Sequence, residues 1–279
     1  MLDTNQNQTM ESGNHYIIKG GEEGKKRLNA LANVLESQTR SLINSVGDMA
    51  GRKFLDVGCG GGNVSMMAAE LVGKEGHVTA VDFDQEIIHL AIKDAQDTGI
   101  ENITYRALDA YALDYKNQFD VAYSRFLLSH LQQPQLVLNK MAKSVKTGGR
   151  VIVEDIDFSG HFCHPSCDAF SDYVNYFSTA SGNNGQDPNM GLRLLELFRQ
   201  EPLLDNMVFD VIQPCHSEGA GKWMAYNTMD KIKETVVKQG LADLAAIEKV
   251  LAELKTFTED TSTIISLPRI FRVMGYRST

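Results

Sequence analysis

A glycine-rich segment that directly follows a short apolar stretch constrains the fold of this chain more than any other feature. Lys53–Val57 is predicted to be a buried strand, Gly58, Gly60 and Gly62 follow it, and residues 64–72 have a helical pattern. Glycine lacks a Cβ and readily adopts positive φ, so such a turn lets a ligand lie against the main chain. The carboxyl ends of parallel strands form the ligand crevice in open α/β sheets. The segment therefore predicts a ligand site after a first strand.

Predicted strands and helices alternate along much of the chain. Asp84 precedes one helical pattern, and its carboxylate can accept hydrogen bonds from the free N–H groups of the first turn. Alternation of this kind predicts a mostly parallel sheet with helices on both faces. The other expected strands span residues 77–81, 103–107, 119–124, 150–155, 208–213 and 264–276, and the expected helices span 22–46, 84–97, 135–145, 168–180, 192–200, 222–239 and 241–257.

The regular alternation stops after residue 157, where Gly, Pro, Cys and many aromatic residues occur together. We expect residues 1–50 to form an N-terminal tail and a helical cap, with residues 1–14 disordered. Residues 51–279 are expected to form one domain that carries lid insertions at about 158–190 and 216–262.

Composition limits the expected partners and compartment. The formal net charge of −9 disfavours non-specific binding to nucleic acid. The polar N-terminal segment is unlike a signal peptide, and no apolar run approaches the ~18 residues that a membrane span needs. Four cysteines are too few for a disulfide framework in a chain of 279 residues. We expect a cytoplasmic monomer or homodimer without a nucleic-acid or membrane partner.

The spacing of the glycines discriminates between two kinds of ligand. A dinucleotide site favours G-x-G-x-x-G, but Asn63 occupies the place of the third glycine, and the pattern found is G-x-G-x-G. Asp56 stands two positions before Gly58, where a carboxylate would repel a pyrophosphate. The same carboxylate suits S-adenosylmethionine, which carries a sulfonium and an ammonium group. The spacing therefore disfavours a nicotinamide oxidoreductase.

Asp56-x-Gly58-x-Gly60-x-Gly62 resembles motif I of class I, Rossmann-like S-adenosylmethionine-dependent methyltransferases. The resemblance covers about residues 50–157 and implies a seven-stranded mostly parallel sheet with helices on both faces. It implies that Asp82 accepts hydrogen bonds from the ribose hydroxyls and that Asp109 receives the adenine amino group. Further residues assigned to this cofactor site are Phe83, beside Asp82, and Ala110, beside Asp109.

The segment that begins at Asn14 and runs to Leu28 resembles that of small-molecule methyltransferases of the ubiquinone and natural-product type. In such enzymes this segment folds over the cofactor, so the resemblance implies that Tyr16 and Arg27 contact it. The alternative is an ordinary N-terminal helix preceded by a glycine hinge. A small-molecule acceptor is therefore expected, with S-adenosyl-L-homocysteine as the second product.

The acceptor side offers one candidate general base. His130 follows the fourth strand, and an ordinary imidazole, with a pKa of about 6.5, suits proton transfer near neutrality. The alternative is a buried or helix-capping histidine. Arg125 is a candidate for binding the cofactor carboxylate or an anionic acceptor. Carboxylates at the end of the fifth strand are either acceptor contacts or turn and cap residues: Glu154, Asp155 and Asp157.

A short segment of the first lid insertion contains His161, Cys163, His164 and Cys167. These residues could indicate a zinc site. However, one short segment of chain rarely supplies all ligands of a tetrahedral site, so we predict no metal. A lid packed with aromatic side chains is the alternative that we favour. Such side chains would pack within the lid or line a pocket for an apolar or aromatic acceptor: Phe158, Phe162, Phe170, Tyr173, Tyr176, Phe177 and, further on, Trp223.

The expected activity is transfer of a methyl group from S-adenosylmethionine to a small molecule, at oxygen in preference to nitrogen or carbon. Methyl transfer mainly requires alignment of nucleophile, methyl carbon and sulfur, with water excluded. Two alternatives stay open: a protein or nucleic-acid methyltransferase, and a non-catalytic protein that binds adenosylmethionine. The segment after the fourth strand, Ser124-Arg-Phe-Leu, lacks the Asn/Asp-Pro-Pro-Tyr/Phe pattern of enzymes that methylate flipped bases.

Overall fold

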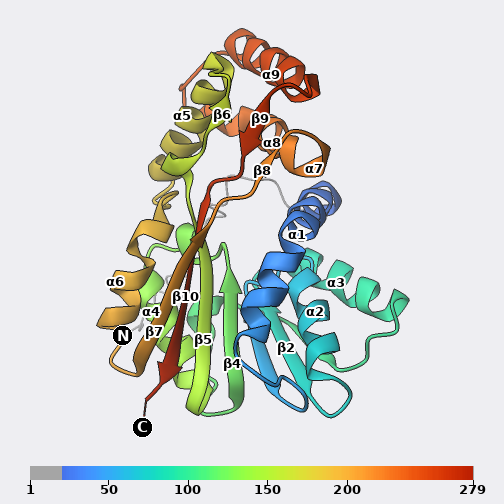
Figure 1. Ribbon diagram of the computed structural model, residues 1–279, viewed down its shortest axis with the longest axis vertical. Coiled ribbons are helices and arrows are strands. Elements are labelled where there is room, and N and C mark those ends of the chain that lie inside the picture. Colours follow the sequence, from blue (N-terminus) through green and yellow to red (C-terminus); the bar gives the residue numbers. More distant parts are fainter. Residues whose placement is uncertain (1–20, 279) are drawn as a thin grey trace, which may run out of the picture.

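The computed structural model describes residues 21–278, and in these residues the larger of two sheets has seven strands. Their order is β3-β2-β1-β4-β5-β10-β7 (Figure 1). The first five are parallel, whereas β10 is antiparallel to both β5 and β7. The strands are β1 (Lys53–Val57), β2 (His77–Asp82), β3 (Ile103–Ala107), β4 (Phe119–Arg125), β5 (Val145–Asp157), β7 (Leu204–Ile212) and β10 (Arg269–Arg277). The predicted mostly parallel, seven-stranded sheet is confirmed.

Helices cover both faces of this sheet because its strands bury side chains on alternate sides. Leu55 and Val57 of β1 face a core built with α4 (Pro134–Ser144) and α6 (Leu194–Gln200). Phe54 faces the opposite core, built with α2 (Asn63–Val72) and the end of α1 (Gly21–Asn44). Helix α3 (Gln85–Asp97) packs beside α1 and against β2 and β3, and its predicted cap, Asp84, accepts hydrogen bonds from the backbone of Glu86 and Ile87.

A second lobe, which we call the lid, lies beyond the carboxyl ends of the parallel strands (Figure 1). Three helices, α5 (Asp168–Asn183), α8 (Met224–Lys238) and α9 (Leu244–Glu259), pack around a separate apolar core. Beside them are the short helix α7 (Gly219–Lys222) and a small antiparallel sheet with the order β6-β9-β8. The strands of this sheet are β6 (Cys163–His164), β8 (Cys215–His216) and β9 (Ile264–Ser266). The boundaries of the predicted lid insertions stay predictions.

The prediction of one last strand over residues 264–276 is wrong. The segment forms two strands, β9 in the lid and β10 in the main sheet, separated by Leu267 and Pro268. Proline has no backbone N–H to donate to a ladder, so it favours a break in strand pairing. The sequence also did not reveal the small lid sheet, because β6 and β8 are too short to show a periodic pattern.

The disordered tail predicted for residues 1–14 lies outside the described residues. In residues 21–278, no helix combines the length and apolar character that crossing a bilayer requires.

Candidate functional site

A cavity of about 1260 Å³ separates the carboxyl ends of the parallel strands from the lid. Its walls come from both lobes, from the glycine segment after β1 to Met224 and Thr228 on α8. Among the residues predicted for the site, its lining contains Arg27, Asp56, Gly58, Gly60, Asp82, Phe83, Asp109, Ala110, Arg125 and His130. Tyr16 lies outside the described residues. The fold thus gathers residues that are far apart in the sequence at one cavity.

The glycine segment forms a tight turn at the floor of the cavity. Gly58 and Gly60 have φ of 74° and 49°, values that favour glycine over residues with a Cβ. The backbone N–H groups of Gly58 and Cys59 donate to the carbonyl of Val81 at 2.8 and 3.0 Å, which attaches the turn to β2. The turn therefore presents main chain to the cavity, as its glycines predict.

Unlike Gly58 and Gly60, Gly62 is not part of the cavity lining. Its φ is 80°, and a Cβ built on it would lie 2.6 Å from the Tyr105 hydroxyl and 3.1 Å from the Cβ of Ala91. The third glycine of the pattern is thus required by the close approach of the turn to α3 and β3.

Two carboxylates stabilise the turn from beneath. Asp56 is buried and accepts a hydrogen bond from the Ser65 hydroxyl at 2.6 Å, and burial raises its pKa to about 6. Asp82 accepts hydrogen bonds from the backbone N–H of Gly60 at 2.9 Å and of Asp84 at 3.0 Å. Burial raises the pKa of Asp82, against the lowering effect of these backbone donors. The acidic end of the cavity is therefore held by a fixed hydrogen-bond network.

Phe83 and Asp109 border the same end of the cavity. Phe83 is 61% exposed, so its ring is available to cover a ligand. Asp109 accepts a hydrogen bond from the Tyr111 N–H at 2.8 Å through one carboxylate oxygen, and Ala110 follows it in a short 3₁₀ turn. Together with Asp82, these residues line the edge formed by the ends of β2 and β3.

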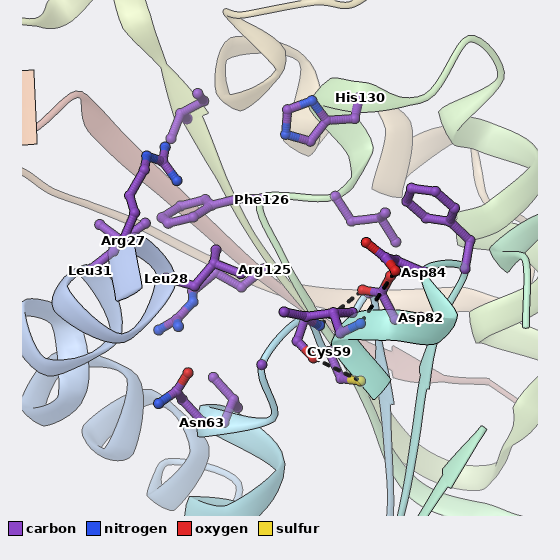
Figure 2. Close-up of a pocket in the computed structure, with 18 of the residues that line it drawn as sticks. Arg27, Leu28, Leu31, Cys59, Asn63, Asp82, Asp84, Arg125, Phe126 and His130 are labelled. Atoms are coloured by element: carbon purple, nitrogen blue, oxygen red, sulfur yellow. Dashed lines mark hydrogen bonds between the residues drawn. The ribbon is translucent and has the colours of Figure 1, made fainter. Parts of the chain in front are cut away.

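Two arginines flank the middle of the cavity. Arg27 extends from α1 to the cavity (Figure 2). Its Nε is buried without a hydrogen bond. Arg125 ends β4 and donates a hydrogen bond to the Thr39 hydroxyl of α1 at 3.1 Å. The next residue, Phe126, has a φ of 56°, which is uncommon for a residue with a Cβ, and its N–H donates to the Glu154 carbonyl at 2.8 Å. This turn directs the chain after β4 along the cavity wall.

His130 lies in the 3₁₀ turn Leu128–His130 and lines the cavity on the side opposite Cys59 in the view of Figure 2. Burial, with a smaller contribution from the positive charge of Arg27, lowers its pKa to about 4. The imidazole is therefore neutral at pH 7. A neutral imidazole has one ring nitrogen that can accept a proton.

The carboxylates at the end of β5 are absent from the cavity lining, in favour of their predicted alternative as structural residues. Glu154 accepts hydrogen bonds from the Tyr123 hydroxyl at 2.6 Å and the Thr39 hydroxyl at 3.2 Å. Asp155 accepts from the backbone N–H groups of Ser129 and Ile156. Asp157 forms an ion pair with Arg269 at 2.5 Å. Each carboxylate ties β5 to a neighbouring segment.

The lid residues that resembled a zinc cluster are distributed over different surroundings. Cys163 and His164 form β6, which pairs with β9, whereas His161 lines the cavity. Among residues 21–278, no three His, Cys, Asp or Glu side chains are grouped so that they would hold a metal ion.

Sequence reasoning did not assign several residues of the lid side of the cavity. They are His161, Gln186, Thr228, Leu267 and Pro268, together with Ile156 and Ile270. Of the predicted aromatic residues, Phe158, Tyr173 and Phe177 line the cavity, whereas Phe170 belongs to the lid core and Phe162 is exposed. Helical spacing puts Phe170, Tyr173 and Phe177 on the buried face of α5, but only the fold shows which of these rings also border the cavity.

Comparison with known proteins gives one family and several relatives. A family model described as a methyltransferase domain matches residues 48–228. The ubiquinone biosynthesis O-methyltransferase of Klebsiella pneumoniae is 34% identical over 116 residues, which cover 41% of this chain and 46% of that protein. The chain thus spans about half the length of the curated relatives that it matches.

Solved structures have the same fold at low sequence identity. Phosphoethanolamine N-methyltransferase 2 of Haemonchus contortus, in complex with S-adenosyl-L-methionine, has a TM-score of 0.59 and 14% identity, and the match covers 91% of this chain and 57% of that chain. The YcgJ protein of Bacillus subtilis has a TM-score of 0.55 and 16% identity, and the match covers 87% of this chain and 99% of that chain.

Proposed function

The chain belongs to the methyltransferase-domain family, and from this premise we propose that it transfers a methyl group from S-adenosylmethionine to the oxygen of a small-molecule acceptor. One observation carries the proposal: a single cavity has an acidic end at the glycine turn and an apolar end beneath the lid. The first end suits a cationic methyl donor, and the second suits an acceptor that the lid shields from water.

The acidic end fits the donor in shape and charge. Asp56, Asp82 and Asp109 line it, and the turn at Gly58 and Gly60 brings main chain to the ligand. Adenosylmethionine carries its positive charges on the ammonium and sulfonium, which carboxylates attract. We propose that Asp82 binds the ribose and Asp109 the adenine, with Phe83 covering the base, and that Arg27 or Arg125 pairs with the donor's carboxylate.

The lid end favours an uncharged or anionic acceptor over a cationic one. Its described lining residues include no Asp or Glu, whereas Arg27 and Arg125 stand between the two ends. Most other side chains there are apolar or aromatic, among them Phe158, Phe177 and Met224. An ammonium would be desolvated in this region without a counter-charge, at a substantial free-energy cost. A hydroxyl group on an aromatic or apolar molecule meets no such cost.

His130 is the proposed general base. The acceptor oxygen forms a bond to the methyl carbon, the bond from that carbon to sulfur breaks, and adenosylhomocysteine leaves as a neutral thioether. The acceptor's hydroxyl proton passes to His130, whose low pKa keeps its imidazole unprotonated at neutral pH. The same low pKa makes it a weak base, so it suits an acidic hydroxyl, such as a phenol, better than an aliphatic alcohol.

The proposal is tested in two steps. Calorimetry with adenosylmethionine, adenosylhomocysteine and NAD should show binding of the first two alone. Formation of adenosylhomocysteine is then measured with matched phenols and anilines, and the phenols should react faster. Faster transfer to the anilines would contradict the choice of oxygen. Binding of adenosylmethionine without turnover on any acceptor, small molecule, protein or nucleic acid, would favour a non-catalytic binding protein.

A further inference from the structure

We propose that His161 is the residue that binds and orients the acceptor's hydroxyl group, through a hydrogen bond from the lid side of the cavity. This inference rests on the proposed function and adds to it a second histidine with a role different from that of His130. The proposal rests on one observation. His161 lines the cavity, and both nitrogens of its imidazole are buried without a hydrogen bond.

An imidazole whose two nitrogens both lack a partner is costly in a protein interior. Other polar side chains of this region have partners: Asp157 accepts a hydrogen bond from the Ser159 hydroxyl and pairs with Arg269, and Gln213 donates to the Gly160 carbonyl at 2.6 Å. Among the described groups, the backbone of Ser266 lies close enough to raise the pKa of His161, but no group is at hydrogen-bond geometry to either ring nitrogen. A ligand group in the cavity would supply the missing partner.

The walls around His161 are aromatic and leave few orientations for its ring. The ring centroids of Phe158, Phe170 and Tyr173 lie 4.9, 5.1 and 5.8 Å from that of His161, each in an edge-to-face arrangement. Phe158 also stacks on Phe177, with centroids 4.0 Å apart and planes inclined by 16°. Phe158, Tyr173 and Phe177 all line the cavity. An aromatic ring beside His161 would therefore meet aromatic faces and edges.

The backbone on both sides of His161 is anchored. The preceding carbonyl, of Gly160, accepts the hydrogen bond from Gln213, and the following N–H, of Phe162, donates to the Ser266 hydroxyl at 2.9 Å. Gln213 lies between β7 of the main sheet and β8 of the lid, and Ser266 is the last residue of β9 in the lid. The histidine is thus held in place before a ligand arrives, which lowers the entropic cost of binding.

The charge state of His161 matches a hydroxyl partner. Burial lowers its pKa to about 3, against a smaller raising effect from the backbone of Ser266, so the ring is neutral at physiological pH. A neutral imidazole offers one donor and one acceptor, and a hydroxyl has the same pair of capacities. A hydrocarbon ring would leave both nitrogens unsatisfied. His161 therefore favours hydroxyl-bearing ligands over otherwise similar molecules without the hydroxyl.

The test uses two probes that differ by one hydroxyl, 4-nitrophenol and nitrobenzene. Their dissociation constants are measured by calorimetry with full-length protein and saturating adenosylhomocysteine, in mildly acidic buffer that keeps the phenol protonated. Wild-type protein should prefer 4-nitrophenol by about 3- to 10-fold, the range expected for one hydrogen bond. H161F and H161L should abolish this preference, because neither side chain can donate or accept a hydrogen bond. H161F, which keeps an aromatic ring at this position, should leave the affinity for nitrobenzene within about twofold. H161Q, which can still donate and accept, should retain part of it.

The exposed His164 supplies a matched control, because H164N changes a lid histidine outside the cavity lining and should behave as wild type. Adenosylhomocysteine affinity and thermal unfolding are measured for every variant, and the phenylalanine and leucine variants serve as independent versions of the same change. Retention of the hydroxyl preference in either folded variant overturns the role of His161, and so does its absence in the wild type. Methyl transfer is assayed separately: its absence together with a His161-dependent preference would refute the proposed reaction and leave this binding site standing.

With an acceptor that is methylated, the separate effects of a variant on KM and on kcat give a second test. H161F should raise KM for phenolic acceptors, with a smaller effect on kcat, because His161 holds the acceptor and His130 takes its proton. A loss of kcat alone, with KM unchanged, would contradict the binding role.

Discussion

The substitution Gly62→Ala tests why the glycine pattern has a third member. Gly62 precedes α2 with a φ of 80° and does not line the cavity. We therefore expect the substitution to act through packing against Tyr105 and Ala91, and to destabilise the fold more than it weakens adenosylmethionine binding.

The magnitude follows from two separate contributions. An alanine held in a left-handed conformation costs roughly 1–2 kcal/mol relative to the right-handed one. The new Cβ would also lie 2.6 Å from the Tyr105 hydroxyl and 3.1 Å from the Cβ of Ala91, so one group must move. Overpacking of this kind typically costs about 1–3 kcal/mol. The expected loss in the free energy of unfolding is therefore about 2–5 kcal/mol.

Gly99→Ala is the matched control. Gly99 follows α3 with a φ of 72°, and a Cβ there would have no neighbour within 4 Å, so only the backbone contribution of about 1–2 kcal/mol applies. Urea unfolding followed by circular dichroism measures both variants. Tyr105→Phe in the Gly62→Ala background removes the nearest atom and should recover part of the loss. Equal destabilisation by Gly62→Ala and Gly99→Ala would refute the packing explanation.

Three further predictions concern charged and titratable groups of the site. Asp82→Ala should weaken adenosylmethionine binding by at least about tenfold in calorimetry, because hydrogen bonds to a carboxylate are strong and this one also holds the turn; unchanged affinity would remove Asp82 from the donor site. Since the pKa of His130 is lowered to about 4, its protonation should reduce kcat only at acidic pH near that value, and kcat measured for His130→Gln should be low across the neutral range. Burial raises the pKa of Asp155 to about 6, so the folded protein binds a proton there that the unfolded chain releases near 3.9, and this group lowers stability as pH rises between those values. Urea unfolding should therefore show the stability of Asp155→Asn, relative to wild type, increasing from pH about 4 to about 6 at up to ~1.4 kcal/mol per unit; a constant difference would contradict the raised pKa.

Much of the fold was predictable from local patterns. The strand before Gly58 and the cap at Asp84 follow from short-range chemistry, namely apolar runs, glycine turns and side-chain capping. The break at Pro268, the short strands β6 and β8 and the pairing of the lid sheet were not predicted. In the lid sheet, Cys163 pairs with Ile265 and Cys215 pairs with Ser266, so the pairing joins segments far apart in the chain and no local pattern encodes it.

The same distinction between local patterns and long-range packing applies to the residues of the candidate site. Asp56, Asp82 and Asp109 were predicted from sequence because they lie in or just after recognisable strands, and the ends of adjacent parallel strands must meet at one edge of the sheet. His161 was noticed only as part of an apparent metal cluster. Its place at the cavity depends on how the lid folds back over the sheet.

The sequence alone determined the parallel sheet, the glycine turn and the acidic residues proposed for the methyl-donor site, because each arises from residues adjacent along the chain or from the regular order of strands. Tertiary structure alone decided that Gly62 serves packing, that Glu154, Asp155 and Asp157 are structural, and that His130 and His161 line one cavity as neutral imidazoles. The physical reason is burial. A side chain's charge state and its available hydrogen bonds depend on which distant segments exclude water around it, and in this protein the lid supplies those segments.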